Sequence, residues 1–216
     1  MDYSILQKNW DNFSDAIEKI GGEVRVNSVE AVATEYEIMA LENKLGFHLP
    51  CSLRDVLLNF SRKVEFRWFM PDDFNLSGEL SQIFCGDCHW SLDWIFQFNE
   101  DKNSWLTECF SNIDDPYDRV WHNKLAFHEV GNGDYLAIDL TSKNQEPVVY
   151  LSHDDGDGHG LELAPDFKSF IMAASRIGCV GGEDWQWLPF IDKEKPYLNP
   201  ECENAQIFRS LLGLMA

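Results

Sequence analysis

The hydrophobic residues of this chain change their spacing near residue 60, and this change restricts the possible folds more than any other feature. Before it, apolar residues recur every three or four positions, which is typical of helices that bury one face. Over residues 64–70, apolar side chains occupy every second position, as in a strand with one buried face. Helices in one block followed by strands in another predict an α+β fold rather than repeating βαβ units.

The first predicted helix lies within residues 1–22. Its apolar residues recur at helical spacing, Ser4 and Gln7 have the spacing of a capping box, and Gly21 ends the run. We therefore expect an N-terminal amphipathic helix.

Two more helices are predicted before residue 61. The second begins at Thr34, with Glu37 as its capping-box partner, and ends at Gly46, where a left-handed cap favours glycine. The third follows a Leu-Pro pair, with Ser52 as its expected N-cap.

The second half of the chain predicts an antiparallel meander. Residues 125–130 and 135–140 form a hairpin around the turn 131–133, and residues 148–151 form the next strand. The region 76–111 is less regular, and it predicts a short strand at 90–92 and short helices at 93–98 and 104–110.

Two helices are predicted after the meander. One has Pro165 in its first turn and ends at Gly178. The last is capped by Asn199, and its expected packing face consists of Ile207, Leu211 and Leu214. The predicted fold is thus an α+β antiparallel meander sheet packed with N-terminal helices and a following helix, plus an extra C-terminal helix.

No repeat, low-complexity tract or linker divides the 216 residues. We expect a single domain over residues 1–216, with the N-terminal helix (1–22) and a C-terminal extension (179–216) as its additions.

The chain carries 37 Asp and Glu against 17 Lys and Arg, a formal charge of −20. This charge disfavours direct contact with nucleic acids or anionic membranes, which attract Lys and Arg. It suits a basic protein partner, although solubility alone also explains an acidic surface.

The N-terminal residues lack the basic start and apolar stretch of a signal peptide, and no apolar run reaches the roughly 20 residues that cross a bilayer. We expect a cytoplasmic protein whose cysteines are mostly reduced thiols.

Two groups of residues form a recognisable pattern. The first is the run 38–60, with its Leu-Glu, Leu-Gly and Leu-Pro pairs. The second comprises residues 133–140, 147–154 and 163–170 in order. Together they frame residues from about 30 to 178, and they resemble the SUKH superfamily, the family of the cell-wall assembly regulator Smi/Knr.

The resemblance implies an α+β protein that is mostly non-enzymatic. Many bacterial members are immunity proteins that neutralise a toxin, often a basic nuclease, and eukaryotic relatives act as regulatory scaffolds. We therefore expect an acidic toxin inhibitor, with a regulatory scaffold as the alternative and a metal-binding or hydrolytic enzyme as the third reading.

An acidic loop follows the predicted meander, and it is the first candidate site for a protein partner. Asp154, Asp155 and Asp157 alternate with glycines, and Glu162 lies close behind. The loop resembles a calcium loop, but the register puts Ala164 at the twelfth position, where an acid is needed. A solvated loop or an acidic surface for a partner fits better.

Trp185 and Trp187 are the other candidate partner-binding residues, because Trp is enriched at binding hot spots. Packing in the core is the alternative for both.

Cys85, Cys88 and His89 have the spacing of half a zinc site. A second close pair is missing, although more distant ligands are conceivable: Cys109, His122, Cys179 and Cys202. Buried thiols are the simpler interpretation, and we predict no metal and no cofactor.

Motifs of hydrolases, phosphate loops, zinc proteases and dinucleotide-binding enzymes are absent from the sequence. Several histidines could act as bases, but none has an identifiable orienting partner. We predict no catalytic residue and no enzymatic activity.

Overall fold

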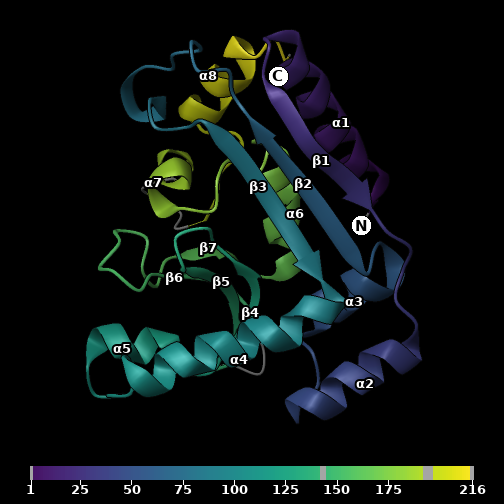
Figure 1. Cartoon of the computed structure of the whole chain (residues 1–216), viewed down its shortest axis with the longest axis vertical. Coiled ribbons are helices and arrows are strands. Elements are labelled where there is room, and N and C mark those ends of the chain that lie inside the picture. The colour runs from purple at the N-terminus through teal and green to yellow at the C-terminus, as the bar shows by residue number, and fades with distance from the viewer. Residues whose placement is uncertain (1, 142–144, 192–196, 215–216) are drawn as a thin grey trace.

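The computed structural model describes residues 2–141, 145–191 and 197–214, and it has the predicted α+β fold, with two antiparallel sheets (Figure 1). The strands are β1 (Glu23–Val29), β2 (Lys63–Phe69), β3 (Cys85–Ser91), β4 (Lys124–Glu129), β5 (Tyr135–Asp139), β6 (Val148–Leu151) and β7 (Glu162–Ala164). The helices are α1 (Ser4–Lys19), α2 (Glu35–Leu45), α3 (Cys51–Asn59), α4 (Leu92–Glu108), α5 (Pro116–Trp121), α6 (Phe167–Ser175), α7 (Asp184–Trp187) and α8 (Glu203–Leu211), with 3-10 turns at Gly78–Leu80 and Leu188–Phe190.

The first sheet has the strand order β1-β2-β3. The alternation predicted for β2 is confirmed, since Val64, Phe66 and Trp68 are buried and the residues between them are half-buried. The sequence does not predict β1, because none of its residues is fully buried and a bulge between Val24 and Val26 shifts its register.

The second sheet is the predicted meander, with the order β4-β5-β6-β7. Its first hairpin turns at Gly133, whose φ of 97° lies in the left-handed region that favours glycine. β7 has only three residues, too few for an alternating pattern to indicate a strand.

The stretch from β3 to α5, residues 85–121, differs most from the predicted secondary structure. β3 begins at Cys85, well before the predicted strand at 90–92. α4 is one continuous helix of 17 residues where the sequence predicts two short ones, and the Ser91 side chain caps it by accepting from the backbone N–H of Asp93. α5 is a further, unpredicted helix, capped by Asp115.

The capping box of Thr34 and Glu37 at α2 and the left-handed Gly46 cap are confirmed. Two of the other predicted N-caps, Ser4 and Ser52, are wrong. At α1 no capping box forms, and the Ser4 backbone N–H instead donates to Asp2. At α3 Pro50 is the N-cap, and the Ser52 hydroxyl accepts from the backbone N–H of residue 167 in α6.

Both helices predicted after the meander are present, but each begins later in the sequence than predicted. α6 ends before Gly178, as predicted, but Pro165 precedes its N-cap, Asp166. The packing face predicted for α8 is wrong for two of its three residues: Ile207 and Leu211 are 42% and 50% exposed, whereas Leu214 is half-buried against the core. The fully buried apolar residues here are Ala205, Phe208 and Leu212. The helix begins at Glu203, with Cys202 rather than the predicted Asn199 as its N-cap. The predicted and the observed inward residues both have helical spacing, so spacing alone does not choose between the two faces.

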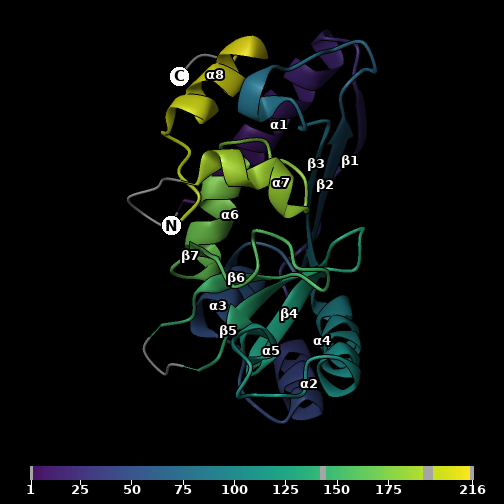
Figure 2. The same ribbon diagram turned by 90° about the vertical axis from the view of Figure 1, so that its left-hand side faces the viewer.

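The main hydrophobic core extends from Leu6 to Leu212 and includes both sheets, α1, α6 and α8. A smaller cluster lies between the second sheet and α4 and α5, around Trp121 and Tyr135. In both views α1 and α8 lie at one end and α2, α4 and α5 at the other (Figures 1 and 2). A core shared from end to end is compatible with one domain, which stays a prediction. Within the described ranges, none of the helices has the length and apolarity needed to cross a membrane.

Candidate functional site

The acidic loop after β6 is held in shape by Ser152. The Ser152 hydroxyl accepts hydrogen bonds from the backbone N–H groups of Asp154 (3.3 Å) and Gly156 (3.0 Å) and donates to the Asp154 carboxylate (2.9 Å). A buried serine thus fixes the first turn of the loop.

His159 and Tyr117 close the other side of this loop. His159 Nδ1 accepts from the Ser152 backbone N–H and Nε2 donates to the Tyr117 carbonyl, both at 3.0 Å, and the two rings stack at 3.7 Å. The Tyr117 hydroxyl donates to the Ser152 carbonyl at 2.6 Å and accepts from the Asp155 N–H at 3.0 Å. Burial lowers the pKa of His159, so the neutral ring that this arrangement requires is favoured.

Asp134, at the end of the β4–β5 turn, anchors the loop from below. It is 2% exposed and accepts hydrogen bonds from the His153 backbone N–H (2.8 Å), the His153 ring (2.6 Å), the Tyr150 hydroxyl (2.5 Å) and the Asn132 amide (2.8 Å). Burial and the neighbouring carboxylate raise the pKa of Tyr150, which keeps its hydroxyl proton in this bond.

Three of the predicted partner-binding residues lie together on this framework. Asp154, Asp155 and Asp157 are exposed, and Asp155 has a φ of 63°. Glu162 does not join them: it is half-buried on β7 and lines a separate pocket of about 640 Å³ together with Lys124 and Asp139.

α7 is joined to the loop through the buried Asp184, which accepts from the Gly158 N–H at 2.8 Å. The expectation that Trp187 forms an anchor for a partner is wrong, because its ring is 3% exposed and packs edge-on against Tyr150 at 5.2 Å. A Cβ at position 158 would lie 2.7 Å from this ring, which explains the glycine there.

Trp185 remains available for contact. It is half-buried, its indole N–H donates to Glu183 (2.8 Å), and its ring stacks at 5.9 Å on Phe84, which is 48% exposed. The sequence does not indicate Phe84, since it lies in the irregular stretch before β3. We call Asp154, Asp155, Asp157, Glu183, Phe84 and Trp185 the acidic aromatic face.

Cys85, Cys88 and His89, whose spacing matches half a zinc site, do not lie together as one ligand group. Residues three apart on a strand point to opposite faces, and the two cysteines have different surroundings. The Cys85 thiol lies 3.5 Å from the Gln186 amide, whereas the buried Cys88 thiol is hydrogen-bonded with Cys179. The alternative of buried thiols holds for Cys88 and Cys179.

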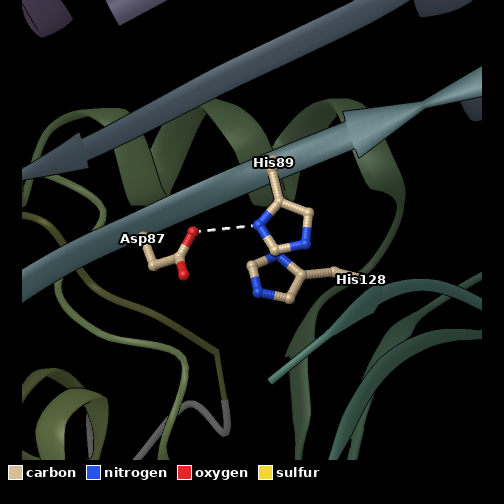
Figure 3. A group of neighbouring side chains, drawn as sticks. All are labelled: Asp87, His89 and His128. Carbon is tan, nitrogen blue, oxygen red and sulfur yellow. Dashed lines mark hydrogen bonds and ion pairs between the residues drawn. The ribbon is translucent and has the colours of Figure 1, made fainter. Parts of the chain in front are cut away.

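β3 and β4 instead bring together Asp87, His89 and His128 (Figure 3). The Asp87 carboxylate is 2.9 Å from His89 Nδ1, and the two imidazole rings stack with centroids 3.7 Å apart. The second Asp87 oxygen is 2.8 Å from the Arg67 guanidinium. The sequence gives no sign of this group, because His128 comes from a different sheet.

The ionisation of this group follows from its surroundings. Burial opposes the charge of Asp87, but the His89 hydrogen bond, the two neighbouring histidines and the Arg67 guanidinium outweigh it and hold its pKa at about 2. Burial, and next the neighbouring His89, lower the pKa of His128 to about 3. His128 is therefore neutral at physiological pH, and its Nε2 atom is buried without a hydrogen bond in the described part of the chain.

These three side chains carry ligand types that metals accept, and their donor atoms lie within 4.8 Å of one another. The geometry does not suit a shared ion, however. The nitrogen lone pairs of stacked rings lie in nearly parallel planes and do not converge on one point, and His89 and Arg67 occupy the Asp87 oxygens. We assign the trio a structural role.

Comparison with known proteins identifies the family. The SMI1 / KNR4 family (SUKH-1) matches residues 32–173, about two thirds of the chain and close to the range framed by the sequence motifs. α1 and β1 precede the match, and α7 and α8 follow it. No curated protein matches the chain. On the extent of this match, the chain belongs to the SMI1 / KNR4 family (SUKH-1).

Proposed function

We propose that this chain is an immunity protein that binds a basic toxin domain and inhibits it by occluding the toxin's substrate-binding surface. Family membership supports an immunity or Smi/Knr-type role in general terms. The role proposed here is binding, with no catalytic residue.

The observation that carries the proposal is the acidic aromatic face. Its three loop aspartates are exposed on a backbone already fixed by Ser152, Tyr117 and His159, so binding requires little further ordering. The exposed Phe84 and the half-buried Trp185 of α7 supply accessible aromatic surface of the kind enriched at hot spots.

Charge complementarity supports the choice of partner. The chain carries a formal charge of −20, which accelerates encounter with a basic surface. Nuclease toxins are basic where they hold nucleic acid, and an acidic inhibitor can occupy that surface.

The test is co-expression with the toxic domain encoded by a neighbouring gene, followed by co-purification and affinity measurement at two salt concentrations. We compare the double variant Asp155→Asn, Asp157→Asn with the control Asp15→Asn, Glu18→Gln. Both remove two exposed charges, and asparagine tolerates the left-handed conformation of Asp155. We expect the first variant to bind about tenfold more weakly at low salt and the control to bind normally.

Failure to rescue growth and to co-purify would reject the immunity role for that pair. Equal affinity of the two variants, with rescue intact, would keep the function and reject the acidic aromatic face. The regulatory scaffold of the Smi/Knr type is the reading favoured if no toxin gene lies nearby.

A further inference from the structure

A second pocket lies where the half-buried side of β2 meets α4 and the end of β4. Its volume is about 300 Å³, at the lower end of ligand pockets and suited to one side chain. It is lined by Glu65, Arg67, His89, Trp94, Phe98 and Glu129. None of these residues belongs to the acidic aromatic face.

Three rings form the wall of this pocket. Trp94 and Phe98, four residues apart on α4, have centroids 6.1 Å apart, and the His89 ring lies 5.9 Å from the first and 6.1 Å from the second. Trp94 and Phe98 are half-buried, so part of each ring stays accessible. Ring faces arranged in this way attract cations.

The chain already places a cation on this wall. The Lys63 ammonium lies 4.6 Å from the Trp94 centroid and 2.6 Å from the Glu65 carboxylate. Lys63 stands beside the pocket rather than among the residues that line it. An aromatic ring and a carboxylate thus act together on a positive group here.

The pocket's own charges leave room for a further cation. Arg67 is paired with Asp87 at 2.8 Å, so its guanidinium is already engaged. Glu129 is exposed and has no ion-pair partner among the described residues. Glu65 is already paired with Lys63, so Glu129 is the carboxylate that would repel an anionic ligand and attract a cation.

We propose that this pocket receives an arginine side chain of a protein partner, with its guanidinium group against the rings and beside Glu129. Arginine fits better than lysine because its planar, weakly hydrated group both stacks on aromatic rings and pairs with carboxylates. The proposal stands whether or not that partner is a toxin.

The test is an NMR titration of the full chain, following the Trp94 indole resonance assigned with Trp94→Phe. The probes are methylguanidinium chloride and the peptides acetyl-Gly-Arg-Gly-amide and acetyl-Gly-norleucine-Gly-amide. We expect the arginine peptide to shift the Trp94 resonance in a saturable manner and the norleucine peptide to leave it unchanged.

Glu129→Gln should weaken this binding about threefold, and Phe98→Leu should weaken it further by removing a ring. Glu100→Gln, which removes an exposed charge of α4 outside the pocket, is the matched control and should have no effect. A response to methylguanidinium but not to the peptide would overturn the partner side chain in favour of a small free cation. No shift with either cation, or equal shifts with norleucine, would overturn the pocket as a cation site.

Discussion

Two histidine–aspartate pairs lie in this molecule, and they differ in what surrounds the carboxylate. Asp134 is buried at the turn of the second sheet and accepts four hydrogen bonds, two of them from His153. Asp87 is partly exposed on the first sheet and divides its oxygens between His89 and Arg67.

The difference separates two uses of the same chemistry. The Asp134 pair ties one chain segment to another and fixes the loop that presents the exposed aspartates. The Asp87 carboxylate is paired with Arg67 and His89, next to the stacked histidines and the pocket lined by Trp94 and Phe98. We therefore expect the first pair to matter mainly for stability, and the surroundings of the second pair to matter for the response to pH through the buried His128.

The largest effect is expected from Asp134→Ala. The change leaves the buried Tyr150 hydroxyl and the His153 groups without their acceptor, which should lower the free energy of unfolding by about 3 kcal/mol or more. Urea unfolding followed by circular dichroism measures it. Asp87→Asn is the comparison and should cost about 1 kcal/mol, because the Arg67 guanidinium reaches solvent and asparagine still offers an oxygen to His89. Equal losses would contradict the distinction between the pairs.

The next largest effect concerns acid. The pKa of His128 is about 3 in the folded chain against roughly 6.5 when unfolded, so below pH 6.5 only the unfolded chain binds this proton. As the pH falls below 6.5, the free energy of unfolding should decrease by about 1.4 kcal/mol per pH unit. The total loss between pH 7 and 4.5 should be about 2 to 3 kcal/mol.

His128→Phe keeps a stacked ring and removes the titration, so its stability should depend less on pH over this range. Asp87, whose pKa of about 2 lies below the range, contributes little to it. Urea unfolding at pH 7, 5.5 and 4.5 gives the two slopes. Parallel slopes for the variant and the unmodified chain would show that His128 is not the group responsible.

The smallest effects are expected at two residues with a positive φ. One lies in the loop fixed by the Asp134 pair, and the other is hydrogen-bonded to Asp87. Asp155 (φ 63°) is exposed, and Asp155→Gly should change stability by no more than about 0.5 kcal/mol, since relief of strain and added chain entropy nearly cancel.

Cys179 (φ 52°) is buried, its carbonyl accepts from the Asp87 N–H, and its thiol lies 3.3 Å from the Trp10 indole nitrogen. Cys179→Gly should therefore destabilise by about 1 to 2 kcal/mol. Thermal unfolding distinguishes the two, and a stabilised Cys179 variant would mean that strain outweighs packing there.

The fold class and the meander could be predicted because their apolar residues repeat with a clear period over several turns or strands. β1 and β7 could not, since β1 has no fully buried face and β7 is three residues long. The face of α8 was mispredicted because two apolar rows have helical spacing there, and only packing against the core shows that Ala205, Phe208 and Leu212 are the buried row.

For the candidate site, the sequence indicates the exposed aspartates, because adjacent acids and glycines imply a loop. It cannot distinguish Trp185 from Trp187, since their difference in burial depends on how α7 packs against Gly158 and Tyr150. The stacking of His89 on His128 depends on contact between two sheets, which local spacing does not encode.

The position of β1 has a consequence for any shortened form of this protein. β1 precedes the family match and covers one edge of β2. It carries an internal bulge and the charged residues Glu23 and Arg25, features that discourage further strands from adding to an edge. A chain trimmed to the matched residues would leave the β2 edge open to pairing with other copies. Self-aggregation, rather than loss of binding, is the first defect to expect from such a trimmed protein.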